Sequence, residues 1–233
     1  MSAPVSQGEI SNPTTDTRPD PRGGRILAPT HAFGLQSGVQ SNVLAIDDTS
    51  VVYPVGRAIV VYNTDSRKIA FVREGTQERG EITSLAISQS KKYLAVGERG
   101  DSATISIYHI SSQKRVKLLP ASPLDMSSNE FVTVAFSADS KMVAAVAGDF
   151  TIALWLWDRQ GRLVALHRNP LGNTMGIDRI TFNPSDCNCM ATTGPRFFKM
   201  WRFADGGLKV WNVNLHKGKD HPVYTDHTWL SGE

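Results

Sequence analysis

Four segments of this chain repeat one pattern at a nearly constant spacing. They cover Leu44–Tyr62, Leu85–Tyr108, Val134–Trp157 and Ile180–Trp201. Each has a short apolar run, a polar turn, a second apolar run that ends at a glycine, and a third run that ends at an aromatic residue. The closing aromatic residues are separated by 46, 49 and 44 residues. Such a period is typical of repeat proteins, whose units bury their apolar faces only by stacking on one another.

Within the repeats, apolar residues follow the period-2 spacing of β-strands. Ile105 and Ile107 fall on one face of a strand, and Ser106 and Tyr108 fall on the other. In Ile152–Asp158 both faces are apolar, as in a strand covered on two sides. A polar turn and one further strand follow each closing aromatic residue. Each repeat is therefore expected to form four antiparallel strands, and no segment has a helical period.

Four-stranded repeats of this length predict the blades of a β-propeller. We expect an all-β, WD40-type β-propeller that is partial, with about four blades and the first strand of a fifth at Asp226–Leu230. The triplet Leu156-Trp157-Asp158 matches the WD signature at the end of a third strand. Its indole is expected to pack between its own blade and the next, and its carboxylate to anchor the following turn. The Asp–His–Ser/Thr–Trp hydrogen-bond set of WD blades is expected to be absent from most repeats.

The chain is expected to contain one disordered arm and one incomplete domain. Residues 1–24 are rich in Pro, Ser, Thr and Gly, with almost nothing to bury, which predicts disorder. Residues 25–233 are predicted to be the N-terminal part of a WD-repeat β-propeller, truncated before closure. Seven blades need about 300 residues, whereas the region from Ile26 holds 208.

Composition excludes several classes of protein. The net charge of +3 is too small to indicate nucleic-acid binding. No apolar run approaches the roughly 18–20 residues of a membrane span, and the N-terminus lacks the apolar segment of a signal peptide. The two cysteines, Cys187 and Cys189, form no disulfide framework and favour a reducing compartment such as the cytosol.

The residues that could carry chemistry have simpler structural interpretations. Cys187 and Cys189 lack the second ligand pair of a structural zinc site, so a turn with one buried thiol is favoured. A metal site or pH sensor is conceivable in the His/Lys-rich stretch, but a solvated loop between blades is favoured. That stretch contains His216, His221, His227, Lys217 and Lys219.

Two further pairs are also interpreted structurally. The carboxylates of Asp47 and Asp48 are expected in a hairpin turn rather than in acid–base catalysis. Trp155 and Trp157 are expected in the core rather than in a ligand site. No residue is therefore assigned to catalysis, to a cofactor or to a metal, and the chain is predicted not to be an enzyme.

Partner binding is expected on the rim loops, which a rigid scaffold holds in place. The candidate loops are Glu98–Ser102, Gly148–Thr151 and Leu171–Asp178. Two basic clusters, Lys91-Lys92 and Lys114-Arg115-x-Lys117, could meet an acidic partner such as the tubulin surface. Protection of an edge strand from aggregation explains them equally well and is favoured.

Several sequence segments that lie outside the general WD consensus resemble those of the cilia- and flagella-associated protein 57 family. The members of this family are WD-repeat proteins of the axoneme. The resemblance covers the chain from His31 onward and is carried by His31–Val39, Val52–Gly56, Val61–Asn63, Phe198–Gly206 and His227–Trp229. It implies a non-catalytic scaffold in the cytoplasm and cytoskeleton, at the axoneme of the cilium or flagellum. The family carries two propellers and a long coiled coil, and helps dock inner-arm dyneins on the doublet microtubule.

What the resemblance implies about partners follows from that role. They are other proteins, namely axonemal complexes, inner-arm dynein and tubulin, with no nucleic acid, membrane or cofactor. The full-length protein is expected to oligomerise through a coiled coil downstream of this chain. Two alternatives remain: a WD-repeat adaptor in trafficking or ubiquitin-ligase assembly, and a propeller enzyme with a metal-lined channel. The apolar first strands of the repeats disfavour the enzyme.

Overall fold

The computed structural model of the protein describes residues 30–73, 80–121, 124–168, 176–195, 197–211 and 223–230. The predicted disordered arm, residues 1–24, lies outside them and stays a prediction. The described residues form β-strands, turns and irregular segments. None of these residues belongs to a helix that is long and apolar enough to cross a membrane.

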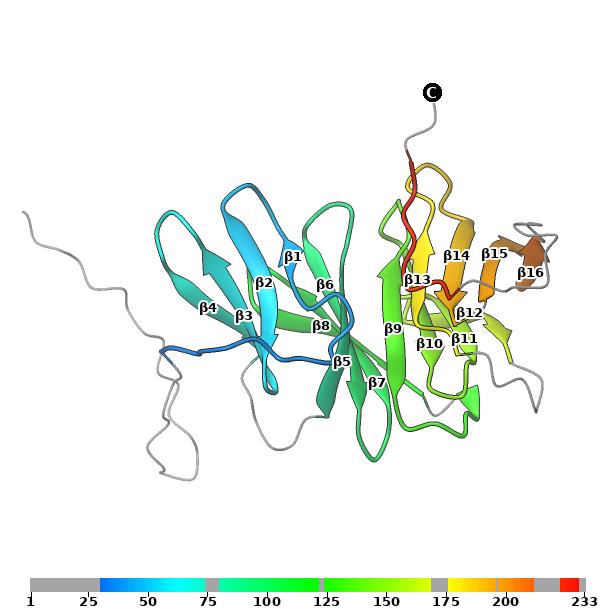
Figure 1. The fold of residues 1–233 in the computed structure, drawn as a ribbon, viewed down its shortest axis with the longest axis horizontal. Helices are drawn as coiled ribbons and strands as arrows, with labels where there is room; N and C mark the ends of the chain where they lie inside the picture. Colours follow the sequence, from blue (N-terminus) through cyan, green and yellow to red (C-terminus); the bar gives the residue numbers. More distant parts are fainter. Residues whose placement is uncertain are drawn as a thin grey trace, which may run out of the picture. The chain divides into compact units, whose positions relative to one another are not determined.

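The first two sheets each contain four strands in sequence order (Figure 1). The first sheet consists of β1 (Leu44–Ala45), β2 (Ser50–Val55), β3 (Ala58–Asn63) and β4 (Ile69–Arg73). The second consists of β5 (Glu81–Ile87), β6 (Tyr93–Arg99), β7 (Thr104–His109) and β8 (Lys114–Pro120).

The other two sheets have the same organisation. The third consists of β9 (Phe131–Phe136), β10 (Met142–Ala147), β11 (Ile152–Leu156) and β12 (Arg162–His167). The fourth consists of β13 (Arg179–Phe182), β14 (Cys189–Gly194), β15 (Phe197–Ala204) and β16 (Gly207–Trp211). All neighbouring strands within a sheet are antiparallel. The predicted all-β fold of four propeller-like repeats is therefore confirmed.

Polar side chains fix the turn between the first two strands of every sheet. Each accepts a hydrogen bond from a backbone N–H a few residues later in the chain, which holds the hairpin closed without a partner from elsewhere. The accepting side chains are those of Asp47, Ser88, Ser137 and Asn183. The turn role predicted for Asp47 is thus confirmed, and its carboxylate receives the Thr49 amide at 2.8 Å.

Apolar clusters join each sheet to the next one along the chain. The first and second sheets share one cluster, the second and third another, and the third and fourth a further one. The largest fully buried side chain in each is, respectively, Tyr108, Trp155 and Trp201. Among the described residues no such cluster links the first sheet to the fourth, so the propeller is partial and not closed.

Three of the four closing aromatic residues, Tyr108, Trp157 and Trp201, pack against the sheet before their own. Trp157 stacks edge-on against Tyr93 of the second sheet, with the ring centroids 4.8 Å apart. The expectation that this indole would pack against the next blade is wrong. Side chains alternate along a strand, so Trp157 shares the face of Trp155 while Leu154 faces the fourth sheet.

The WD triplet also lacks its expected turn contact. Among the described residues the Asp158 carboxylate accepts no hydrogen bond, and the turn is closed by the Arg162 amide donating to the Arg159 carbonyl at 3.2 Å. Trp157 Nε1 donates to the Ser140 carbonyl at 2.8 Å. In the fourth sheet, by contrast, Trp201 Nε1 donates to Thr192 Oγ1 at 2.8 Å, which preserves the Thr–Trp pair of a WD blade.

Candidate interaction surface

The first candidate rim loop, Glu98–Ser102, contains an arginine that forms ion pairs with two glutamates. The Arg99 guanidinium lies 2.5 Å from a Glu81 carboxylate oxygen and 3.4 Å from a Glu130 oxygen. Because Arg99 donates a hydrogen bond and carries a positive charge, it lowers the pKa of Glu81. Arg99 therefore ties the second sheet to the segment that leads into the third.

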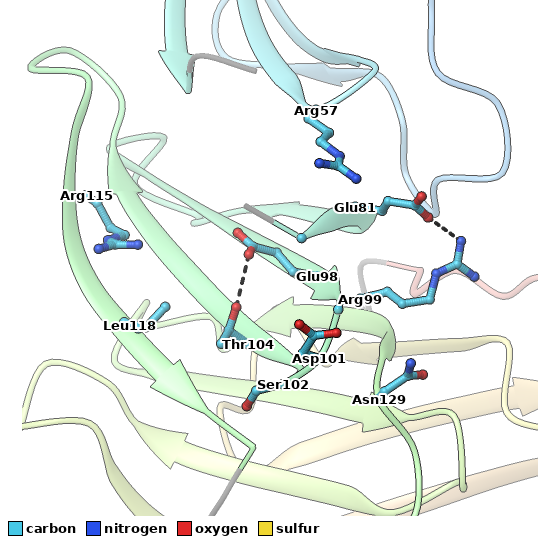
Figure 2. A pocket seen from close by; sticks show the side chains of 12 residues that line it. Arg57, Glu81, Glu98, Arg99, Asp101, Ser102, Thr104, Arg115, Leu118 and Asn129 are labelled. Carbon is cyan, nitrogen blue, oxygen red and sulfur yellow. Dashed lines mark hydrogen bonds and ion pairs between the residues drawn. The ribbon is translucent and has the colours of Figure 1, made fainter. Parts of the chain in front are cut away.

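A cavity of about 700 Å³ lies beside this loop (Figure 2). The second sheet supplies most of its wall, and Arg57 comes from the turn between β2 and β3. Glu98 is buried there and accepts a hydrogen bond from Thr104 Oγ1 at 3.0 Å. The charged lining residues balance in sign: Arg57, Arg99, Arg115, Glu81, Glu98 and Asp101. This polar hollow suits contact with a peptide better than enclosure of a small apolar ligand.

The second candidate loop, Gly148–Thr151, is held by its own carboxylate. Asp149 accepts hydrogen bonds from the backbone amides of Ser127 at 2.8 Å and Thr151 at 3.1 Å. Partial burial opposes ionisation, but these bonds outweigh it and lower the pKa of Asp149. The loop is therefore fixed in shape. Most of the third candidate loop, Leu171–Asp178, lies outside the described residues.

His227 anchors the segment 223–230 to the fourth sheet. Its Nε2 lies 2.6 Å from Thr181 Oγ1 and its Nδ1 lies 2.9 Å from Thr193 Oγ1. Trp229 Nε1 donates to the same Thr181 oxygen at 2.8 Å, and Arg179 pairs with Asp226 at 2.5 Å. The segment thus lies beside β13, as expected for the start of a fifth blade, although its backbone is not a strand.

These contacts correct the loop interpretation of the His/Lys-rich stretch. His227 does not belong to a solvated loop, whereas His216 and His221 lie outside the described residues. Burial, and then the nearby Arg179 charge, lower the pKa of His227, although Asp226 acts in the opposite direction. No local sequence pattern signals this site, because its two threonines precede His227 by 46 and 34 residues.

The remaining candidates carry no assigned chemistry. Burial raises the pKa of the Cys189 thiol, which disfavours the thiolate that a metal would bind. Among the described residues no group of three or more His, Cys, Asp or Glu side chains could hold a metal ion. Trp155 is fully buried, as expected for a core residue. Lys91 donates to the Ala45 carbonyl at 2.9 Å, which ties the second sheet to the first.

Comparisons with known proteins give the fold a context. The chain resembles cilia- and flagella-associated protein 57. It is 30% identical to that protein of Mus musculus over 204 residues, covering 86% of this chain and 16% of the relative. It is 28% identical to cilia- and flagella-associated protein 57 C of Tetrahymena thermophila, covering 76% of this chain and 14% of the relative.

More distant relatives and a solved structure agree with this resemblance. Cilia- and flagella-associated protein 44 of Mus musculus is 23% identical over 189 residues, covering 79% of this chain and 10% of the relative. A chain in the complex of KlAtg21 with the coiled coil of AgAtg16 has a similar fold. Its TM-score is 0.56 at 16% identity, over 71% of this chain and 53% of that chain. No family model matches the chain.

Proposed function

We propose that the chain is part of a non-catalytic WD-repeat scaffold of the cilium or flagellum axoneme, acting in the cytoplasm and cytoskeleton. The observation that carries this proposal is the similarity to cilia- and flagella-associated protein 57 across 86% of the chain. The stacked sheets support it, because a rigid stack holds loops in fixed positions for binding other proteins.

Within that scaffold we propose a role in positioning inner-arm dyneins on the doublet microtubule. Inner-arm dynein, other axonemal complexes and tubulin are the proposed partners, and the whole protein oligomerises through a coiled coil outside this chain. The chain spans about a sixth of the length of its mouse relative, so these partners belong to the whole protein.

The test is deletion of the gene in the organism of origin, followed by imaging of the axoneme and measurement of ciliary beating. We expect loss of a subset of inner dynein arms and slower beating, both restored by a tagged full-length copy that locates to the axoneme. Intact inner arms with normal beating would contradict the dynein role. A tagged copy that stays outside the axoneme would contradict the scaffold proposal itself.

A further inference from the structure

The outer strand of the second sheet, like that of the fourth, is mostly exposed, and it alone of these two carries three cations. Each sheet ends in an outer strand with one unpaired edge, but β8 is exposed at five of its seven residues. The corresponding strand of the third sheet, β12, is exposed at one of six. Val116 and Leu118 of β8 are 46% and 42% exposed, which is high for aliphatic side chains in a strand.

The cations of β8 form no ion pair within the described chain. Lys114, Arg115 and Lys117 lie within four residues, and β8 contains no carboxylate. None of the three forms an ion pair with a described carboxylate, whereas Arg99 pairs with two. Register places Lys114 and Lys117 on the face toward the third sheet and Arg115 on the face toward the first, so the cations lie on both sides of the exposed edge. Cations in this arrangement attract an acidic partner along the edge and raise its rate of association.

Protection of the edge does not explain this composition. A β-bulge already interrupts the strand, because Tyr108 pairs with Arg115 and Ile107 with Lys117, which leaves Val116 without a partner opposite it. Pro120 removes a backbone donor at the end of the strand. Both features block the addition of another strand, and neither calls for exposed aliphatic side chains among the cations.

The side of β8 that carries Arg115 and Leu118 opens onto the cavity beside Glu98 (Figure 2). Within the cavity Glu81 is paired with Arg99, and Glu98 is bonded to Thr104. The balanced charges there leave Lys114 and Lys117, which do not line the cavity, as the attractive region for an anion.

We propose that β8 is a docking surface for an extended acidic segment of a partner protein that also carries aliphatic side chains. Carboxylates of the partner contact Lys114, Arg115 and Lys117, and an aliphatic side chain packs on Val116 and Leu118. The partner segment is recognised by its side chains and not by backbone pairing, because the bulge and Pro120 block regular strand addition. The proposal rests on the scaffold function only in assuming that the protein acts by binding other proteins.

The experiment measures binding of the 233-residue chain to a labelled peptide of alternating Glu and Leu or Val, by fluorescence anisotropy at low salt. We expect saturable binding that weakens at about 300 mM salt, because screening shortens the reach of exposed charges. A matched peptide with Gln in place of Glu should bind about tenfold more weakly or worse. Absence of saturable binding, or tighter binding of a single-stranded oligonucleotide, would overturn the proposal.

Matched double variants locate the surface. Lys114→Glu with Arg115→Glu should weaken binding about tenfold or more, whereas Arg202→Glu with Lys209→Glu, an equal charge change on exposed residues of the fourth sheet, should change it less than about twofold. Equal losses would indicate general charge attraction and overturn the assignment to β8. The neutral pair Lys114→Gln with Arg115→Gln repeats the test should the charge reversal disturb folding.

The aliphatic contact has its own variant. Leu118→Ser should weaken binding several-fold while leaving the salt dependence unchanged, because it removes no charge. Unchanged affinity in Leu118→Ser and in Val116→Ser would overturn the aliphatic part of the site. If no peptide binds, the docking surface is refuted and the axonemal scaffold proposal is unaffected. If the protein is absent from the axoneme, the scaffold proposal is refuted and the docking surface is unaffected. The two failures are therefore distinguishable.

Discussion

At the scale of single residues, hydrogen bonds join parts of the chain that are far apart in sequence. The His227 site is the clearest case. An Nδ1–H tautomer of His227 satisfies all three bonds: Trp229 donates to Thr181, Thr181 donates to Nε2, and Nδ1 donates to Thr193. The neutral imidazole therefore fits this site, in agreement with its lowered pKa.

The stability of the segment 223–230 should depend on pH. Because the pKa of His227 is lower in the folded state, the unfolded state binds the proton more readily, and stability rises with pH. Its contribution should be complete above the unfolded pKa of about 6.5 and should be lost as the pH falls below it. Thermal unfolding at about pH 5.5 and about pH 7.5, on either side of that value, measures this effect.

The matched control for that experiment is His227→Gln, which retains hydrogen-bonding groups but cannot titrate. The difference between wild type and variant isolates His227 from His167, whose pKa is also lowered by burial and by Lys199. Identical pH profiles for the two proteins would contradict the assignment.

The Trp201–Thr192 hydrogen bond should contribute more to the free energy of unfolding than an exposed threonine hydroxyl does. Replacement of Thr192 by Val keeps the shape but leaves a buried indole N–H without a partner, which costs about 1–3 kcal/mol. Chemical denaturation checks this value. The exposed control Thr228→Val should change stability by less than about 0.5 kcal/mol, and an equal effect of both would refute the role of the bond.

At the scale of strands, close approach of other groups explains why a glycine lies at or near the end of the second strand of a repeat. A side chain at Gly194 would overlap the Gly176 carbonyl oxygen, and one at Gly97 would overlap the Ser84 hydroxyl. These glycines let the chain that enters the first strand of a sheet lie against the end of the second. Gly56 differs, since it sits in a tight turn with a φ of 58°.

Gly194→Ala should therefore destabilise the fourth sheet by about 1–3 kcal/mol, as overpacking does. The matched control is Gly207→Ala in β16, where an added methyl group meets no atom within 4 Å. Denaturant midpoints of the two variants give the comparison. Equal stability of Gly194→Ala and wild type would show that the backbone shifts without cost.

At the scale of the whole molecule, the described sheets stack in sequence order and leave two sheet faces without a neighbouring sheet. On the first sheet, strand register places Tyr53, Tyr62 and Phe71 on the face opposite the shared cluster. On the fourth sheet, register aligns Met200 with Trp211 on the face opposite Trp201. Trp211 is 54% exposed. Such apolar faces favour association.

The purified chain should self-associate as its concentration rises, which sedimentation velocity measures. Trp211→Ser should reduce the association, because it removes the largest exposed aromatic side chain from the fourth sheet. Val116→Ser, which removes an exposed aliphatic side chain from an outer strand, should leave it nearly unchanged. A monomer at all concentrations would contradict the expectation.

The sequence by itself determined the number of sheets, their strand order and the buried role of Trp155, because a fixed repeat and period-2 alternation are local properties. Tertiary structure alone decided against which adjacent sheet each closing aromatic residue packs, as Trp157 shows. Alternation of apolar residues along a strand does not tell which of its two faces meets the preceding sheet and which meets the following one. Tertiary structure also decided the Arg99 ion pairs and the His227 site, because their partners come from other strands of the stack. Contacts between residues 18 to 46 positions apart leave no local pattern in a single sequence.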